Sequence, residues 1–192
     1  MTEIEVEKIE SNWKKYEKIL GRISCDGIGN LLESMGERIV MCPLSRSSNE
    51  PGAYPGGLIE HSLGVASTMK KLNDSLEMGL PMESILKVSL LHDIGRVGDE
   101  ENDLFIPQDS DWHREKLGQN YKYNENLSRM SVTHRTLYLL QRFGISLTRE
   151  EWVAIQISGG SHFEENRFYV GFEPSLGILL QKSKSLVMHR SS

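Results

Sequence analysis

The chain has 192 residues, of which 38% are hydrophobic and 26% are charged, and this length and composition are typical of one globular domain. No run of about 20 apolar residues is present, so the sequence excludes a membrane-spanning helix. The formal net charge is −5, which argues against nucleic acid as a partner because general phosphate-backbone binders usually carry an excess of basic residues.

The first residues and the cysteine content both bear on the cellular compartment of the protein. The chain begins MTEIEVEKIE, which is too acidic for a signal or transit peptide. Only Cys25 and Cys42 are present, without a CxxC pair, so neither a disulfide framework nor a zinc site is indicated. We therefore expect a cytoplasmic protein.

Apolar residues recur mostly at helical spacing, which predicts an all-α fold. Two helix starts carry a capping-box pair, Thr2 with Glu5 and Thr148 with Glu151. The predicted helices, in chain order, cover residues 2–20, 26–35 with Asp26 as the cap, 58–76, 81–95, 131–143, a segment starting at Thr148, and a last segment starting near Pro174 with Leu176, Leu179, Leu180, Ser183, Leu186 and Val187 facing inward.

Three stretches do not fit helices. Residues 40–57 are rich in Pro, Gly and Ser and are predicted to be loop. Residues 96–128 form a long irregular insert, which is either a functional loop or a plain surface insert. Residues 160–173 show short alternation and are predicted to form a small β-hairpin. We expect a single domain over 1–192, with N-terminal helices in 1–39, the main body in 40–189 and a tail at 190–192.

Two histidines and one aspartate stand out by their helical context. His61 precedes Val65, Met69 and Leu72 on one helix face, and His92 follows Val88 and Ile85 on another, so both are expected to point inward. Asp93 closes the same apolar run, and a buried carboxylate is costly unless it is paired or metal-bound. A lone inward histidine is more commonly a core residue, but the three together indicate a metal site.

The motifs LLHDIG at 90–95 and YPGGLIEHSLGV at 54–65 resemble the HD superfamily of metal-dependent phosphohydrolases, and the similarity runs from about residue 40 to 188. It includes LGQNYKYNENL at 117–127, LTREEWVAI at 147–155 and FEENRFY at 163–169. The resemblance implies an all-helical domain with a metal centre between the helices. It implies His61, His92 and Asp93 as the ligands.

The same comparison reveals departures from the family pattern. The last metal ligand of the family is an aspartate, and the best register places Lys184 there, with Ser183 at the preceding alanine. Family histidines align with Ser158 and Val132, and either His134 or His162 is a candidate replacement. His134 is shifted from Val132 by two positions, or about 200° around a helix.

Lys184 leaves several outcomes open. At about 4 Å, replacing an aspartate by a lysine changes the electrostatics of a cation site by several kcal/mol. The metal is then weakly held, or the lysine is deprotonated, or it points away, or its ammonium takes the place of the cation and pairs with Asp93. A register shifted by one turn would instead offer Gln181 as a weak ligand.

Two functions remain as hypotheses. The first is a metal-dependent phosphohydrolase for a nucleotide or another small phosphorylated molecule, with one divalent ion (Mn, Fe, Zn, Co, Ni or Mg). Asp93 and Lys184 would be catalytic, and the substrate-binding residues would be Arg96, His134, His162 and Lys184. The second is a catalytically degenerate HD-fold binding or regulatory protein with a weakened metal site. Both allow an oligomer.

Overall fold

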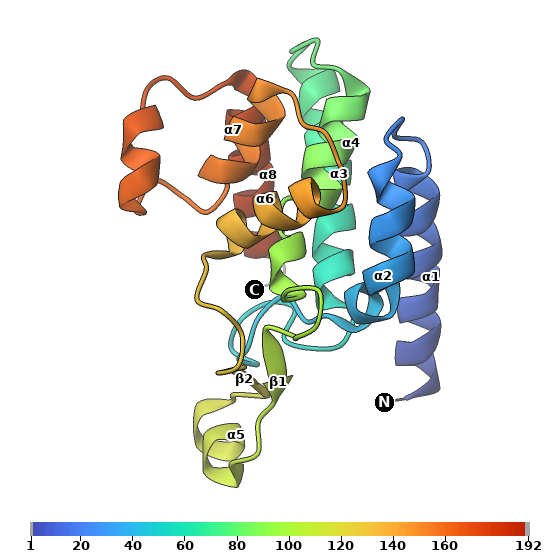
Figure 1. Cartoon of the computed structure of the whole chain (residues 1–192), viewed down its shortest axis with the longest axis vertical. Helices are drawn as coiled ribbons and strands as arrows, with labels where there is room; N and C mark the ends of the chain where they lie inside the picture. Colours follow the sequence, from blue (N-terminus) through green and yellow to red (C-terminus); the bar gives the residue numbers. More distant parts are fainter. Residues whose placement is uncertain (1, 191–192) are drawn as a thin grey trace.

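The computed structural model describes residues 2–190, and its regular secondary structure is mostly helical (Figure 1). Its α-helices are α1 (Glu3–Leu20), α2 (Gly27–Met41), α3 (Gly57–Ser75), α4 (Met82–Leu91), α5 (Asp111–Leu117), α6 (Val132–Arg142), α7 (Arg149–Ile157) and α8 (Ser175–Arg190). Two short 3-10 helices, η1 (Ile94–Arg96) and η2 (Glu164–Tyr169), and two strands, β1 (Phe105–Pro107) and β2 (Tyr121–Tyr123), complete the described elements. The all-α prediction is confirmed.

Helices α3 and α4 form the centre of the molecule. Helices α1 and α2 cover one side of this pair, and α6, α7 and α8 lie on the other side (Figure 1). The most extensive helix contacts join α3 to α4 and α3 to α8, and α6 packs directly on η1. The short segment that follows α4 is therefore enclosed by elements from both halves of the chain.

The helix starts follow the sequence signals where a side chain can reach the free N–H groups. Both capping boxes form, at Thr2 with Glu5 and at Thr148 with Glu151. Asp26 precedes α2, but its side chain makes no capping hydrogen bond, so that part of the prediction is wrong. Helix α2 also continues six residues beyond the predicted end because its last turns bury Ile39 in the core.

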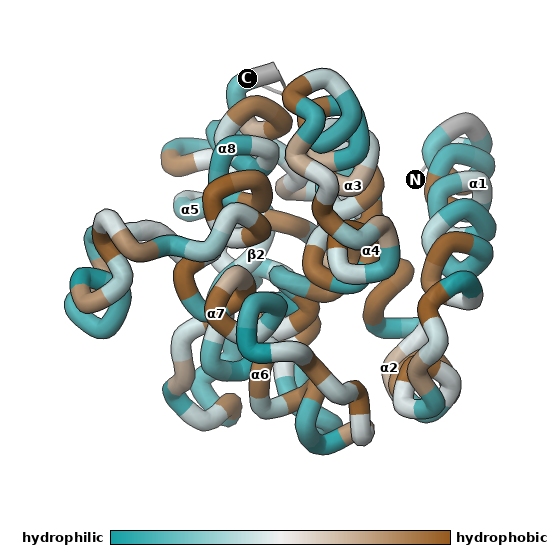
Figure 2. Tube along the Cα trace, turned by 90° about the horizontal axis from the view of Figure 1, so that it is seen from above, coloured by the Kyte–Doolittle hydropathy of each residue, from teal (hydrophilic) through white to brown (hydrophobic). Residues whose placement is uncertain are grey.

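A single large apolar core joins the helices. In Figure 2 the hydrophobic segments of α3, α4 and α7 lie toward the interior, whereas the outer side of α1 is mostly hydrophilic. The largest fully buried side chains are Tyr16, Leu20, Leu31, Met35, Ile39, Ile59, Met69, Ile85, Leu90, Leu91, Ile94 and Leu139. No helix within residues 2–190 is both long enough and apolar enough to cross a membrane.

The insert at 96–128 is more ordered than its sequence suggests. Strands β1 and β2 pair antiparallel, and Phe105 lies opposite Tyr123 with ring centroids 5.6 Å apart. The short helix α5 lies between them, starting after the Ser110 cap. This aromatic cross-strand pair stabilises a hairpin that the mixed charge of the segment conceals.

The predicted hairpin at 160–173 is wrong. The segment contains η2, and the side chains of Phe168 and Phe172 are 85% and 86% exposed. Among the described residues, no strand pairs with this segment. Instead Asn166 is buried and donates to the carbonyl of Gly160, which fixes a helical turn.

Helix α8 differs from its predicted face at one position. Leu176, Leu179, Leu180 and Ser183 are buried as expected, but Leu186 is 44% exposed. The helix extends to Arg190, so the predicted tail at 190–192 begins with a helical residue, and 191–192 lie outside the described residues.

Candidate metal site

The end of α4 positions two of the three predicted ligands. Helix α4 ends at Leu91, His92 follows as its C-cap, and the chain leaves the helical conformation at Asp93 before turning into η1. Gly95 permits the close approach of α6 to η1, because a Cβ there would lie 2.4 Å from the carbonyl oxygen of Val132 at the start of α6. The close packing of α6 against η1 therefore encloses the end of α4.

Helix α3 supplies the third predicted ligand. His61 lies on the buried face of α3 and its ring centroid is 5.8 Å from that of His92. One ligand atom from each of His61, His92 and Asp93 lies within 4.8 Å of the other two, and all three residues are buried. The inward orientation predicted from helical spacing is confirmed for these side chains.

The histidines present unpaired nitrogen atoms to this group. The Nε2 atoms of His61 and His92 are buried and have no hydrogen-bond partner among the described residues. The Nδ1 of His92 lies 2.9 Å from the carbonyl oxygen of Ser89, which can only accept, so Nδ1 carries the hydrogen. The lone pair is then on Nε2, where a metal ion would bind.

Burial also keeps both rings neutral. It lowers the pKa of His61 to about 3, with a further contribution from the neighbouring His92. Burial likewise lowers the pKa of His92 to about 4, against the opposing charge of Asp93. Neutral imidazole is the metal-binding form, so these two groups are ready to bind a cation at neutral pH.

Both carboxylate oxygens of Asp93 are already paired with cations. Oδ1 lies 3.1 Å from Lys184 Nζ, and Oδ2 lies 2.9 Å from Arg96 Nε. Burial by itself would raise the pKa of Asp93, but the charges of Lys184 and Arg96 outweigh it and hold the pKa well below its usual range. Arg96 is held in place by a second bond, from Nη1 to the carbonyl of Leu44.

The ion pair confirms the register that places Lys184 beside Asp93. Of the outcomes left open by the sequence, the geometry matches the one in which the ammonium takes a cation's place. Burial lowers the pKa of Lys184, and the charge of Asp93 partly offsets that effect. The alternative ligand Gln181 is wrong, because its Nε2 donates to the carbonyl of Ile157 on α7.

The other two predicted substrate-binding residues are placed away from this group. His134 is exposed, and its Nε2 lies 3.4 Å from Nε2 of Gln156. His162 is exposed and its ring lies against Phe163, with centroids 4.2 Å apart. The shift from Val132 to His134 turns the side chain to another face of α6, which explains why His134 does not replace the family histidine.

The three candidate ligands fit a single divalent ion. Two unpaired Nε2 atoms and one carboxylate form a mixed nitrogen and oxygen donor set, which suits Zn, Mn, Fe, Co or Ni. Lys184 already occupies one carboxylate oxygen, so a metal would compete with it for Asp93. Ser158 and Ser183 also carry buried hydroxyl groups that have no partner within residues 2–190.

Part of the chain matches a known protein family. Residues 58–150 match the HD domain. This match, over 93 of the 192 residues, supports membership of the HD superfamily. The HD match runs from the start of α3 to the start of α7, so it contains His61, His92 and Asp93 but ends before Lys184. HD proteins are generally metal-dependent phosphohydrolases. No curated protein and no solved structure matched the chain.

A buried arginine beside η1 was not predicted from the sequence. Arg135 on α6 is only 3% exposed and donates to the carbonyl of Gly95 in η1. Its position four residues before Leu139, on the inward face of α6, was the available signal. An arginine on a buried helix face is rare unless its charge or its hydrogen bonds are used.

Proposed function

We propose that this chain is a metal-dependent phosphohydrolase that acts on a nucleotide or another small phosphorylated molecule. The observation that carries this proposal is the pair of unpaired Nε2 atoms, from His61 and His92, beside the Asp93 carboxylate. Two buried nitrogen atoms without partners are costly in a folded protein unless something binds them. A divalent ion would satisfy both.

The residues around this group have separable tasks. When bound, a divalent ion would lower the pKa of a water molecule and polarise a phosphoryl oxygen. Ser89 orients His92, and Arg96 fixes the Asp93 carboxylate. Lys184, at 17% side-chain exposure, is the cation best placed to neutralise the charge of a substrate phosphate. Asp93 and Lys184 are therefore the residues to which we assign the chemistry.

A second function is favoured by one observation, the ion pair between Lys184 and Asp93. The two lysine and arginine charges exceed the single carboxylate charge in this group, so the group carries a net positive charge before any ion binds. That charge disfavours a divalent cation. A catalytically degenerate HD protein, which binds a ligand or partner without hydrolysis, would show this arrangement.

The experiment that separates the two functions starts from metal binding. The metal content of the purified protein is measured, and Mn²⁺ is then titrated into the metal-free protein by calorimetry. The hydrolase predicts one ion per chain and metal-dependent phosphate release from a panel of nucleotides and sugar phosphates. No binding and no hydrolysis would overturn it in favour of the binding protein, and two ions per chain would show that the single-ion site is wrong.

A substitution at Lys184 sharpens the same experiment. Lys184→Asp replaces a repulsion of the cation by an attraction, so Mn²⁺ should bind at least about tenfold more tightly. If Lys184 serves the substrate phosphate, this variant should hydrolyse more slowly despite its tighter metal binding. If the natural chain is degenerate, the variant should gain activity. Lys182→Asp, on the exposed side of the same helix, is the matched control.

A further inference from the structure

One hydroxyl group on α6 is bonded to both ends of the segment that carries His92 and Asp93. We call this segment, residues 92–95, the HD turn. Thr136 is fully buried, and its Oγ1 donates to the carbonyl of His92 at 3.1 Å. The same Oγ1 accepts from the backbone N–H of Gly95 at 3.0 Å. A side chain from another helix therefore holds the first and the last residue of the HD turn.

These two bonds satisfy backbone groups that a helix leaves without partners. The carbonyls at the end of one helix and the N–H groups at the start of the next have no partner within those helices. Such a group is costly to bury if it stays unpaired. A hydroxyl is both a donor and an acceptor, so Thr136 can pair with a carbonyl and an N–H at once. A valine at this position would have nearly the same shape and could pair with neither.

Thr136 directs its hydroxyl away from its own helix. Ser62 on α3 and Ser185 on α8 donate to the carbonyl four residues earlier in the same helix, which is a common pattern for helical serine and threonine. Thr136 bonds across to the HD turn instead. Its hydroxyl therefore stabilises the position of the turn rather than the backbone of α6.

The peptide group that Thr136 holds is the one that joins two of the candidate ligands. The carbonyl of His92 belongs to the planar peptide between His92 and Asp93, so its orientation sets the directions in which the two side chains leave the backbone. The ligand atoms of these residues and of His61 lie within 4.8 Å of one another. Because a binding site needs its groups placed to within about 0.5 Å, a rotation of this peptide would disturb the site.

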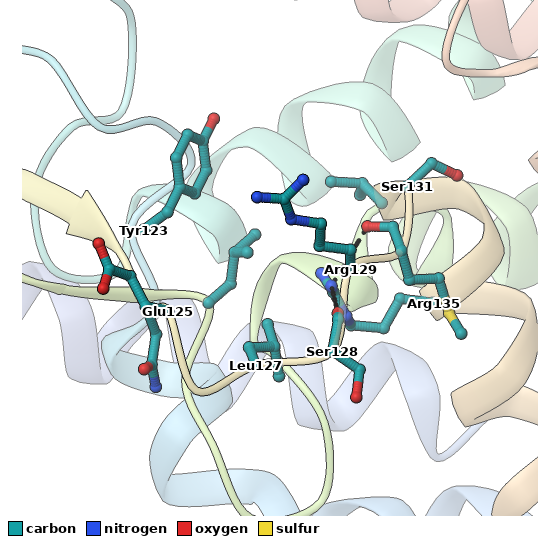
Figure 3. A pocket seen from close by; sticks show the side chains of 11 residues that line it. Tyr123, Glu125, Leu127, Ser128, Arg129, Ser131 and Arg135 are labelled. Atoms are coloured by element: carbon teal, nitrogen blue, oxygen red, sulfur yellow. Dashed lines mark hydrogen bonds between the residues drawn. The ribbon is translucent and has the colours of Figure 1, made fainter.

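Arg135, the neighbour of Thr136, holds the same turn at a further point. Its Nη1 donates to the carbonyl of Gly95 at 3.3 Å. Its Nη2 donates to the carbonyls of Ser128 and Met130, in the connection between the insert and α6 (Figure 3). Consecutive residues of α6 therefore bind both the N–H and the carbonyl of Gly95, which fixes the end of the HD turn against this helix.

We propose that Thr136 is a positioning residue for the metal site, and that it acts by holding the peptide between His92 and Asp93 through its hydroxyl. This inference rests on the proposed function, because that function supplies the divalent ion. The hydroxyl bonds backbone atoms of the turn, so it affects an ion through His92 and Asp93 and not by contact with it.

The first test is a calorimetric titration of Mn²⁺ into the metal-free full chain. Thr136→Val removes both hydrogen bonds, so the dissociation constant of Mn²⁺ should rise about tenfold. Thr136→Ser keeps the hydroxyl and should restore the affinity of the wild type. Thr133→Val is the matched control, because Thr133 is a buried threonine of α6 whose hydroxyl lies 3.2 Å from Ser131 Oγ. It should leave the Mn²⁺ affinity unchanged.

The second test needs no metal. Side-chain ¹⁵N NMR spectra of the histidines are recorded in EDTA, and the signals of His92 are identified by their absence in His92→Gln. These signals should shift in Thr136→Val and keep their positions in Thr136→Ser and Thr133→Val. If Thr136→Val does not fold, Thr136→Cys takes its place, because a thiol forms weaker hydrogen bonds than a hydroxyl. The same changes are then expected at smaller size.

The outcomes separate this proposal from the proposed function. In a chain that binds Mn²⁺, unchanged affinity or unchanged His92 signals in Thr136→Val would overturn the positioning role. An equal loss of affinity in Thr133→Val would overturn it too, and so would a Thr136→Ser variant that behaves like Thr136→Val. A wild-type chain that binds no Mn²⁺ overturns the hydrolase alone, and the His92 signals then decide whether Thr136 positions the turn.

Discussion

Within residues 2–190, two lysines pair with a buried carboxylate, and the surroundings of these two pairs differ. Lys87 on α4 lies 3.1 Å from Glu151 on α7, and Lys184 on α8 lies 3.1 Å from Asp93. Both carboxylate side chains are 2% exposed. Glu151 also accepts from the backbone N–H of Thr148, and Lys87 also donates to the carbonyl of Ser146. The charged groups of the first pair therefore find all their partners within the fold.

The second pair is next to two groups that it does not satisfy. The Nε2 atoms of His61 and His92 have no partner among the described residues, although they lie beside the same carboxylate. Both sites therefore contain a buried carboxylate paired with a lysine, and such an ion pair does not indicate function by itself. The unpaired nitrogen atoms are the feature that distinguishes a candidate metal site from a structural ion pair.

The largest expected effect comes from breaking the structural pair. Glu151→Ala should lower the free energy of unfolding by about 3–5 kcal/mol, because Lys87 is left buried without its counter-charge. Urea denaturation at pH 7 measures this change. Glu150→Ala, at the adjacent and exposed carboxylate, should change stability by no more than about 0.5 kcal/mol. Equal losses in the two variants would show that the Lys87 pair is not a structural element.

The histidines beside the second pair should make stability fall in acid. Their pKa values in the folded protein, about 3 for His61 and about 4 for His92, lie below the ordinary 6.5. The unfolded chain therefore binds protons first as pH falls. The stabilisation is complete above pH 6.5 and is lost as pH decreases toward 4, by up to about 1.4 kcal/mol per pH unit for each histidine.

Urea denaturation between pH 7 and 4.5, in EDTA, measures this slope. His92→Gln should reduce it, because one of the two buried imidazoles is removed. His189→Gln, at an exposed position on α8, should leave the slope as it is. An unchanged slope in His92→Gln would contradict the assignment of the acid sensitivity to this site.

Removing the lysine charge from the second pair should strengthen metal binding. In Lys184→Met the ammonium no longer competes for Asp93 Oδ1, so the dissociation constant of Mn²⁺ should fall about tenfold, or about 1.4 kcal/mol. Calorimetric titration of the metal-free protein provides the measurement. Lys182→Met is the matched control because that side chain is exposed on the same helix. Identical Mn²⁺ affinities in wild type and Lys184→Met would show that Lys184 does not compete with the metal for Asp93.

The smallest expected effect concerns the cap that supports Glu151. Thr148→Ala removes one half of the capping box and should cost about 1 kcal/mol in urea denaturation. Thr2→Ala, at the exposed capping box of α1, should cost less because the start of that helix is in solvent. The effects of Thr148→Ala and Glu151→Ala should not add, since both disrupt one network. Strict additivity would show that the cap and the ion pair act independently.

The parts of the fold predicted from sequence are those set by local pattern. The spacing of apolar residues placed His61 and His92 on inward faces, and the family register placed Lys184 beside Asp93. The hairpin of β1 and β2 was missed because it depends on pairing Phe105 with Tyr123 across the helix α5. The hydrogen bonds of Arg135 were also missed, since they are made by a tertiary arrangement that no local spacing specifies.

The long separation between Asp93 and Lys184, 91 positions along the chain, has a consequence for the order of assembly. During synthesis, helices α3 and α4 and the local partner Arg96 exist before α8 has been made. A divalent ion present at that stage meets the histidines without competition from the lysine. We expect metal occupancy to depend on this history. Refolding with Mn²⁺ present should give a higher initial occupancy than adding Mn²⁺ after refolding, and equal occupancies would contradict this expectation.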